Sequence, residues 1–164
     1  MDELEIRSAR ESDAELIRDA VKAVAAEKWY LATIDGWSLQ DTRAFLQHIV
    51  EHDLPQATAF SQGIAVGFCD IVPNAAVGFS HVGRLGMGVR SDWRRQGIGR
   101  RLLEVCLSRA KSSALEKVEL EVYSDNVGPM KLYESFGFTR EGVKLRGLML
   151  DGRYQDIVLM ALWI

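Results

Sequence analysis

The chain has 164 residues, of which 48% are hydrophobic and 26% are charged, and its formal net charge at pH 7 is −3. This length suits one globular domain with its own core, and we expect residues 1–164 to form a single domain. The mild negative charge argues against a non-specific nucleic-acid binder. The charged N-terminal segment lacks the apolar stretch of a signal peptide, and the late apolar run IVLMALWI is too short to span a membrane. We therefore expect a cytoplasmic protein without a membrane partner.

The N-terminal segment predicts one strand and one helix. Residues 4–9 alternate between polar and apolar side chains, as a half-buried strand does. Ser12 and Glu15 have the spacing of a capping box, which predicts a helix over 14–28. An irregular stretch rich in aromatic residues follows.

A second helix and a pair of strands come next. Ser38 and Asp41 mark the start of a helix over 39–53, and the proline that follows must end it. Residues 57–72 predict two strands joined by a hairpin turn at 61–63.

Three glycines, at positions 83, 86 and 88, interrupt the strand predicted over 79–89. Glycine inside a strand often marks a bulge or a place where another backbone or a ligand comes close. From Gly97 the apolar period becomes helical, and one stripe is expected to face the core: Ile98, Leu102, Leu103, Cys106, Leu107 and Ala110.

The C-terminal third predicts a strand over 117–124 and a short helix that begins after Asn126 and stops at Gly137. Two strands surround Asp151-Gly152, a favoured hairpin dipeptide. The order is strand, two helices, three strands, helix, strand, helix and two strands. This order indicates one mixed α/β domain.

The stretch DWRRQGIGRRLL, residues 92–103, runs from a predicted strand into a predicted helix. Backbone N–H groups and the positive end of a helix dipole meet at such a place and favour anions, phosphates above all. Gly97 and Gly99 would let a ligand approach the backbone. The Gly-Lys-Ser/Thr of a P-loop and the third glycine of the dinucleotide fingerprint are both missing. Alone, this stretch also fits a solvated helix start in which Arg100 pairs with Glu104.

Two motifs stand in order along the chain: MGVRSDWRRQGIGRRLL at 87–103 and LEVYSDNVGPMKLYESFGF at 120–138. The first resembles the strand, the Arg/Gln-x-x-Gly-x-Gly/Ala loop and the helix of the GNAT superfamily of acetyl-CoA-dependent N-acetyltransferases. The second resembles the strand, the asparagine and the Leu-Tyr-Glu-x-x-Gly-Phe segment of that superfamily. The resemblance implies a central, twisted, mostly antiparallel sheet of about six to seven strands, with about four helices packed on both faces.

The resemblance also implies acetyl-CoA as cosubstrate and direct transfer of its acetyl group to a primary amine in a ternary complex. In the family, the strand backbone pairs with the pantetheine arm, and the loop N–H groups bind the pyrophosphate. The residues that match the family's cofactor-binding positions are Met87, Gly88, Val89, Arg94, Arg95, Gln96, Gly97, Ile98, Gly99, Arg100, Asn126 and Tyr133.

Tyr133 and Asn126 carry the implied chemistry of the second motif. In the family the tyrosine hydroxyl protonates the leaving thiolate, and the asparagine contacts the cofactor. A phenol suits this role because it is protonated at neutral pH and its pKa of about 10 is close to that of a thiol. The alternatives are an aromatic side chain packed on the sheet for Tyr133 and a helix N-cap for Asn126.

A base is also needed, because an ammonium group must lose a proton before its nitrogen can attack a thioester. Glu121 matches the position of the base in some family members, and its alternative is a solvated or cross-strand-paired glutamate. Asp70 and His81 are weaker candidates, and a water relay is a further alternative. Cys69 and Cys106 lie in apolar runs without metal-ligand spacing, so we expect buried thiols, no metal site and no acetyl-cysteine intermediate.

The acceptor pocket is expected between the first two helices and at the C-terminal hairpin. The predicted acceptor-binding residues are Glu27, Trp29, Tyr30, Asp35 and Trp37, which combine aromatic walls with negative charge. The alternative is that the aromatic residues fill the core under a loop. The family members that this chain resembles acetylate amino acids, phosphinothricin-like compounds, polyamines or ribosomal-protein N-termini, and we favour a small-molecule amine such as an amino acid.

Three further points concern the oligomeric state and two alternative functions. The apolar run DIVLMALWI permits a homodimer through the C-terminal strands, although a buried strand would look the same. A non-catalytic acyl-CoA-binding module would keep the fold without the chemistry. A nucleic-acid binder would use the clustered arginines, but interleaved aromatic residues and a known binding motif are missing, so we expect no nucleic-acid partner.

Overall fold

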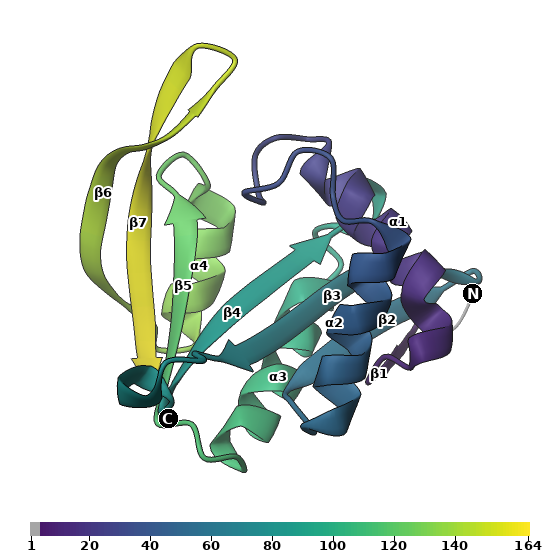
Figure 1. Ribbon diagram of the computed structural model, residues 1–164. Coiled ribbons are helices and arrows are strands. Elements are labelled where there is room, and N and C mark those ends of the chain that lie inside the picture. Colours follow the sequence, from purple (N-terminus) through teal and green to yellow (C-terminus); the bar gives the residue numbers. More distant parts are fainter. Residues whose placement is uncertain (1–3) are drawn as a thin grey trace.

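The computed structural model describes residues 4–164, and within this range it shows seven strands, four α-helices and three short 3₁₀ helices (Figure 1). The α-helices are α1 (Ala14–Ala25), α2 (Leu39–Glu51), α3 (Ile98–Lys111) and α4 (Val127–Ser135). The strands are β1 (Glu5–Arg7), β2 (Gln56–Ser61), β3 (Ile64–Pro73), β4 (Val82–Val89), β5 (Lys117–Tyr123), β6 (Thr139–Leu150) and β7 (Arg153–Trp163). The 3₁₀ helices are η1 (Glu11–Asp13), η2 (Val77–Phe79) and η3 (Ser91–Trp93).

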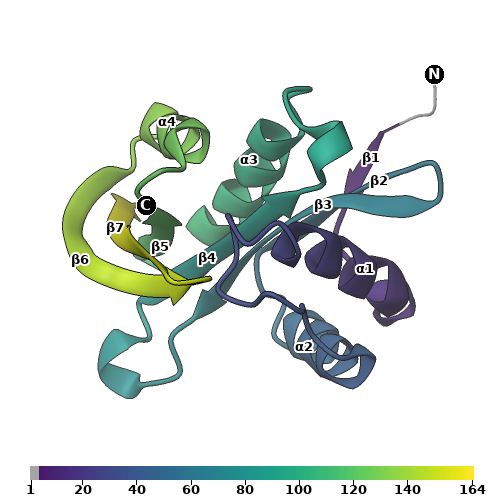
Figure 2. The same cartoon turned by 90° about the horizontal axis from the view of Figure 1, so that it is seen from above.

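All seven strands form one sheet in the order β1-β2-β3-β4-β5-β7-β6. The strands β4 and β5 run parallel, and the other neighbouring pairs are antiparallel. The helices α1 and α2 lie on one face of the sheet, and α3 and α4 lie on the other (Figure 2). The predicted order of helices and strands and the predicted fold class are therefore confirmed.

Each face of the sheet has its own buried cluster. All six residues of the stripe predicted for α3 are buried against the sheet, where they pack with Val118 and Leu120 of β5. On the opposite face, Ile17 and Val21 of α1 pack with Phe68 of β3. The sheet is thus held between two layers of helices, which fixes the positions of its strand ends.

The helix α2 and the β2–β3 hairpin form as predicted. The Ser38 hydroxyl accepts a hydrogen bond from the Asp41 N–H at 3.0 Å and so caps α2. The turn at Gln62 and Gly63 has φ angles of 53° and 74°, which suit a two-residue hairpin of type I′.

The β6–β7 hairpin turns at Asp151-Gly152, also as predicted. The apolar run at 156–164 belongs to β7, which lies between β5 and β6. Its buried residues are Ile157, Val158, Met160 and Ala161. Burial inside the sheet therefore accounts for the run that was also compatible with a dimer interface.

Two of the three glycines in β4 are required by the packing of β3. A Cβ atom at position 83 would lie 2.5 Å from Ile71 Cγ2, and one at position 88 would lie 2.8 Å from Phe68 Cζ. The register between β3 and β4 runs without a bulge from Gly67–Pro73 to Gly83–Val89. These glycines therefore allow large β3 side chains to cross the adjacent strand.

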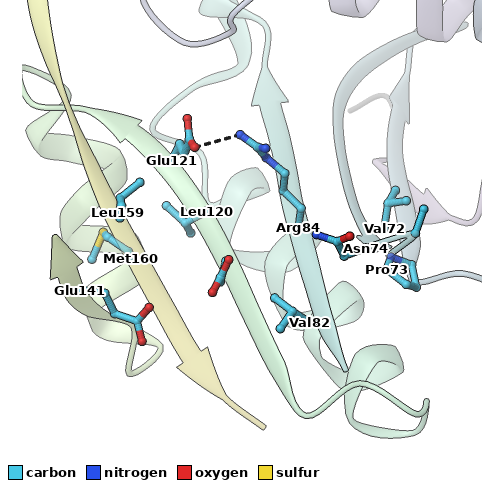
Figure 3. A pocket seen from close by; sticks show the side chains of 12 residues that line it. Val72, Pro73, Asn74, Val82, Arg84, Leu120, Glu121, Glu141, Leu159 and Met160 are labelled. Atoms are coloured by element: carbon cyan, nitrogen blue, oxygen red, sulfur yellow. Dashed lines mark ion pairs between the residues drawn. The ribbon is translucent and has the colours of Figure 1, made fainter. Parts of the chain in front are cut away.

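The strands β4 and β5 pair over three residues each and then diverge (Figure 1). The pairing joins Val82–Arg84 to Lys117–Glu119. Near the point of divergence, Arg84 Nη2 lies 3.1 Å from Glu121 Oε1, and this ion pair links the two strands (Figure 3). The β5-facing edge of β4 beyond Arg84 is therefore left available to a ligand.

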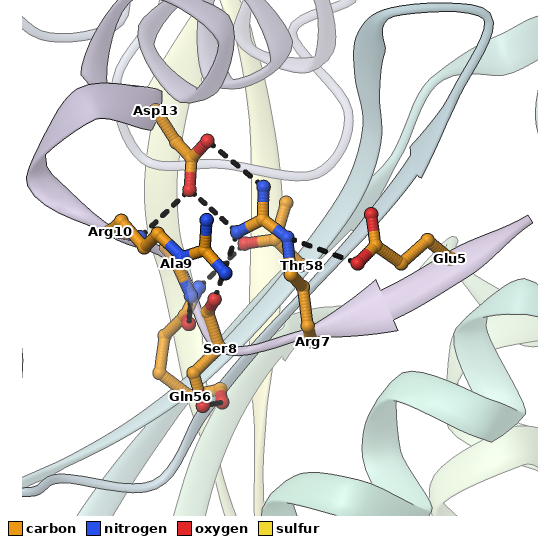
Figure 4. A network of polar contacts seen from close by, with 8 residues as sticks. All are labelled: Glu5, Arg7, Ser8, Ala9, Arg10, Asp13, Gln56 and Thr58. Carbon is orange, nitrogen blue, oxygen red and sulfur yellow. Dashed lines mark hydrogen bonds and ion pairs between the residues drawn. The ribbon is translucent and has the colours of Figure 1, made fainter.

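The start of α1 differs from the prediction, because the capping box of Ser12 and Glu15 does not form. Instead, η1 precedes α1, and the Asp13 carboxylate accepts hydrogen bonds from the Arg10 N–H at 2.8 Å and from Arg7 Nη1 at 2.7 Å (Figure 4). The hydrogen bond from Arg7 holds the pKa of Asp13 below its usual range. The buried carboxylate of Asp13 thus accepts the hydrogen bonds of Arg7 and Arg10 where the chain enters α1, and a serine cap is not needed.

Within residues 4–164, no helix is long and apolar enough to cross a membrane.

Candidate active site

Two cavities adjoin the diverging part of β4. The α3–α4 cavity, of about 750 Å³, is lined by the end of β4, the loop at 91–100 and α4. The α1–α2 cavity, of about 620 Å³, is lined by α1, α2, the loop between them and the middle of β3 and β4. Met87 lines both cavities, and the adjacent residues Tyr30 and Leu31 line one each. The cavities therefore meet at β4 and at the loop between α1 and α2.

The loop at 94–97 turns the chain into α3 and has a left-handed backbone at Arg95, with φ of 59°, and at Gly97, with φ of 78°. A Cβ atom at position 97 would meet no protein atom within 4 Å. The first N–H groups of α3 have no carbonyl partner within the helix. The loop therefore combines free N–H groups, the positive helix end and open space, as an anion site requires.

All but one of the residues predicted to bind acetyl-CoA line the α3–α4 cavity. These are Met87, Gly88, Val89, Arg94, Arg95, Gly97, Ile98, Gly99, Arg100, Asn126 and Tyr133. The exception is Gln96, whose side-chain amide donates to the carbonyl oxygen of Asp92 at 3.1 Å. The fold thus brings the two sequence motifs to one cavity, while the binding role of each residue stays a prediction.

Arg94 connects the α1–α2 loop to the end of β4. Its Nη1 donates to Glu27 Oε2 at 2.7 Å and to the Tyr30 hydroxyl at 3.2 Å, and its Nε donates to the Val89 carbonyl at 2.8 Å. The guanidinium carbon lies 4.3 Å from the centre of the Tyr30 ring. Arg94 was predicted to bind the cofactor and Glu27 the acceptor, and in this structure their charges neutralise each other.

Replacing Arg94 with glutamine is expected to lower the free energy of unfolding by about 1–3 kcal/mol, because the half-buried Glu27 carboxylate loses its charged partner. Denaturant unfolding measures this change. The exposed neighbour Arg95 provides the control R95Q, which should leave the unfolding free energy nearly unchanged. Equal stabilities of the two variants would show that the Arg94 contacts do not stabilise the loop.

Asn126 also holds the α1–α2 loop, since its side-chain amide donates to the carbonyl oxygen of Trp29. The alternative role of Asn126 as an N-cap is not realised, because its side chain makes no capping hydrogen bond to α4. On a third side, Lys28 Nζ lies 3.0 Å from Asp151 Oδ2 in the β6–β7 turn. The loop is thus tied to η3 by Arg94, to α4 by Asn126 and to the β6–β7 hairpin by Asp151.

Tyr133 is 8% exposed, lines the α3–α4 cavity, and packs its ring 5.8 Å from the Phe138 ring centre. Burial, with a smaller effect from Cys69, raises the pKa of its hydroxyl above the usual value. The phenol therefore holds its proton at neutral pH. Both sequence interpretations of Tyr133 are compatible with this position, since the ring packs in the core and the residue also borders the cavity.

Glu121 points from β5 toward β4 and the C-terminal hairpin. Its Oε1 accepts a hydrogen bond from Lys144 Nζ at 2.6 Å and also pairs with Arg84 (Figure 3). Glu121 borders the α3–α4 cavity, and its carboxylate is shared between two cations. His81 precedes β4 at the end where β4 and β5 still pair, away from Met87.

One of the predicted acceptor-binding residues lines the α1–α2 cavity. Trp37 lines it, together with apolar side chains of α1 and α2 and the carboxyl group of Asp70. Tyr30 lines the α3–α4 cavity instead. Trp29 and Asp35 are exposed and belong to neither set of lining residues. The acceptor-binding assignments stay predictions.

Several residues of the α1–α2 cavity were not singled out from the sequence. Phe45 and Phe68 occupy apolar positions in a helix and a strand, so their pattern is that of ordinary core residues. Arg84 gave a clearer signal, because strand alternation places it on the same face of β4 as Gly86 and Gly88. A charged side chain beside two glycines on one strand face indicates a site that is both open and polar.

Comparison with known proteins identifies the family. Residues 19–138 match the model of the acetyltransferase (GNAT) family. The chain is similar to the L-amino acid N-acetyltransferase AaaT of Escherichia coli strain K12, with 28% identity over 166 aligned positions and 98% of each protein covered.

Solved structures agree in fold. An acetyltransferase of the GNAT family from Streptococcus pneumoniae superposes with a TM-score of 0.92 at 27% identity, covering 99% of this chain and 100% of that one. A phosphinothricin acetyltransferase from Sinorhizobium meliloti, in complex with acetyl-CoA, superposes with a TM-score of 0.91 at 15% identity, covering 98% and 88%. The resemblance of the two motifs is thereby confirmed: the chain belongs to the acetyltransferase (GNAT) family and is an N-acetyltransferase.

Proposed function

We propose that the protein transfers the acetyl group of acetyl-CoA directly to the primary amine of a small molecule such as an amino acid. The observation that carries this proposal is the meeting of two cavities at Met87. One cavity has the phosphate-type loop and three arginines, and the other has aromatic walls and a single carboxyl group. Donor and acceptor would approach β4 from these two cavities.

The α3–α4 cavity fits acetyl-CoA on structural grounds. The loop around Gly97 offers N–H groups to the pyrophosphate, and the arginines beside it complement the phosphate charge. The edge of β4 that β5 leaves unpaired offers backbone partners to the amide groups of the pantetheine arm. Tyr133 lines the same cavity, and we propose that its hydroxyl protonates the departing thiolate.

Direct transfer is supported by the state of the two cysteines. Both thiols are fully buried, and Cys106 Sγ donates to the carbonyl oxygen of Cys69 at 3.2 Å. The contact with Cys106, together with burial, raises the pKa of the Cys69 thiol well above its usual value. Neither sulfur is accessible to a substrate, so we propose a ternary complex without an acetylated enzyme.

The acceptor is proposed to be small because the α1–α2 cavity has a volume of about 620 Å³ and the loop between the helices forms part of its wall. Its apolar lining suits an acceptor with a hydrophobic side chain, and AaaT, the relative that matches along the whole chain, is named for L-amino acids.

The test is to mix the purified protein with acetyl-CoA and a panel of amino acids, polyamines, amino sugars and peptides with free N-termini, and to measure free thiol and the acetylated product. We expect acetyl-CoA to bind and small amines to be acetylated. Absence of acetyl-CoA binding would overturn the proposal. Binding without turnover of any amine would favour a non-catalytic acyl-CoA-binding module, and preference for peptides would favour a protein N-terminus.

We further propose that the protein forms a homodimer through β6. This strand lies at one edge of the sheet, and the β6–β7 hairpin exposes apolar side chains: Val143, Leu145, Met149 and Tyr154. An exposed edge with apolar side chains favours pairing with a second chain.

We expect the wild type to sediment as a dimer at micromolar concentration and L145K to sediment as a monomer. The control V77K changes an exposed valine in η2 and should remain dimeric. A monomeric wild type would overturn this proposal.

A further inference from the structure

Asp70 is a carboxylic acid in the middle of β3 that faces the α1–α2 cavity. It pairs in register with Gly86 on β4. A Cβ atom at position 86 would lie 3.5 Å from Asp70 Oδ1, so a larger side chain there would crowd the carboxyl group. The glycine at position 86 therefore leaves Asp70 open toward the cavity.

The surroundings of Asp70 leave it without a charge partner. The residues of α1, α2 and the loop between them that line this cavity are apolar or neutral. The side-chain amide of Gln56 on β2 is already hydrogen-bonded, since its oxygen accepts from the Ala9 N–H and its nitrogen donates to the Thr58 hydroxyl. Among the described residues that line this cavity, the other ionisable group is Arg84, which is paired with Glu121. Asp70 is therefore free to meet a cation that enters the cavity.

Asp70 also lies close to the border between the α1–α2 cavity and the α3–α4 cavity. Its neighbour Cys69 pairs in register with Met87, the residue that the two cavities share. Successive residues of a strand point to opposite faces, so Cys69 faces α3 and Tyr133 while Asp70 faces α1 and α2. Asp70 and Tyr133 thus approach the same section of the β3–β4 pair from opposite sides.

We propose that Asp70 is the catalytic base that accepts a proton from the ammonium group of the acceptor. This inference rests on the proposed function and assigns one step of it. Burial raises the pKa of Asp70 from its usual value to about 7, which suits exchange of a proton with an amine near neutral pH. Glu121 is the less suitable base, because two cations share its carboxylate.

Two protons leave the acceptor nitrogen during the transfer, and each has its own acceptor. The Asp70 carboxylate takes one proton from the ammonium group, and the nitrogen lone pair attacks the thioester carbonyl carbon. The C–S bond then breaks, and the sulfur takes the Tyr133 proton. The tyrosinate takes the second proton from the nitrogen of the acetylated product. Asp70 finally releases its proton to solvent, so one proton is lost for each acetyl group transferred.

The test compares the wild type with D70N at saturating acetyl-CoA and varied amine. D70N should lower kcat/KM for the amine by about 10²-fold or more at pH 7, while the Kd for acetyl-CoA changes less than twofold. The control E121Q removes the other candidate base and should lower kcat/KM less than tenfold.

Wild-type kcat/KM should rise through pH 7 and then level. The D70N value should keep rising toward the pKa of the amine, because that variant depends on amine that is already neutral.

Folding of the variant is checked separately. The pKa of Asp70 is higher in the folded than in the unfolded chain, so ionisation of Asp70 destabilises the fold. This destabilisation is absent below about pH 4 and complete above about pH 7. D70N should therefore unfold at the same or a higher temperature than the wild type at pH 8. A folded D70N that retains wild-type kcat/KM and the same rise through pH 7 would overturn the inference. Failure of the proposed function would instead appear as absence of acetyl-CoA binding or turnover in the wild type.

Discussion

Replacing Tyr133 with phenylalanine is expected to lower kcat by about 10²-fold or more while leaving the Kd for acetyl-CoA within threefold of the wild type. The ring would still pack against Phe138, so the fold and the wall of the α3–α4 cavity are retained. What is lost is the hydroxyl, which burial keeps protonated at neutral pH. Without that proton the thiolate must leave as an anion in a largely apolar part of the cavity.

Measurement of kcat by thiol release and of Kd by calorimetry separates the two effects of Y133F. Tyr123, a buried tyrosine of β5, supplies the matched control, because its hydroxyl has no hydrogen-bond partner in the part of the chain that the structure describes. Y123F should therefore keep wild-type turnover. If Y133F kept it as well, the hydroxyl of Tyr133 would have a packing role and the protonation of the thiolate would belong elsewhere.

Replacing Gly97 with valine is expected to weaken acetyl-CoA binding by about 10- to 100-fold. A β-branched residue at φ of 78° strains the backbone, and its side chain would project into the open space in front of the loop. Calorimetric titration with acetyl-CoA measures the loss. Side-chain charge should matter less than loop geometry here, so R100Q should weaken binding by about tenfold or less.

The backbone strain alone is measured by the control G63V. Gly63 has φ of 74° in the β2–β3 turn, and a Cβ there likewise meets no protein atom within 4 Å. Both variants should lose about 1–3 kcal/mol of unfolding free energy, while G63V should bind acetyl-CoA normally. Equal affinities of G97V and G63V would argue against pyrophosphate binding at this loop.

The regular elements could be predicted because their signals are local. Ser38, three residues ahead of Asp41, caps the start of α2. The turn between β2 and β3 needs positive φ angles, and it places a glycine at position 63, where such an angle is easily adopted. The start of α1 could not be predicted in the same way. There the donors are met by Asp13, whose partner Arg7 comes from the preceding strand, and a capping pattern within four residues cannot reveal that contact.

The site was predictable to the extent that it depends on backbone. The loop around Gly97 and the position of Tyr133 follow from the two motifs and meet in one cavity. The destination of long charged side chains does not follow from them. Arg94 reaches Glu27, which lies 67 residues earlier in the chain, and Glu121 reaches Lys144 in a strand that follows it by 23 residues. Such pairs are set by the register of the sheet and the path of the loops.

The shared border at Met87 bears on how enzymes of this architecture diversify. Most of the α3–α4 cavity wall comes from α3, α4 and the loop at 91–100, with Tyr30 added from the α1–α2 loop, whereas most of the α1–α2 cavity wall comes from α1, α2 and the loop between them. Among the described residues, the two sets of lining residues have Met87 alone in common. Under the proposed function, changes around Trp37 and Phe45 would alter the choice of amine, while the residues proposed to bind acetyl-CoA would stay as they are.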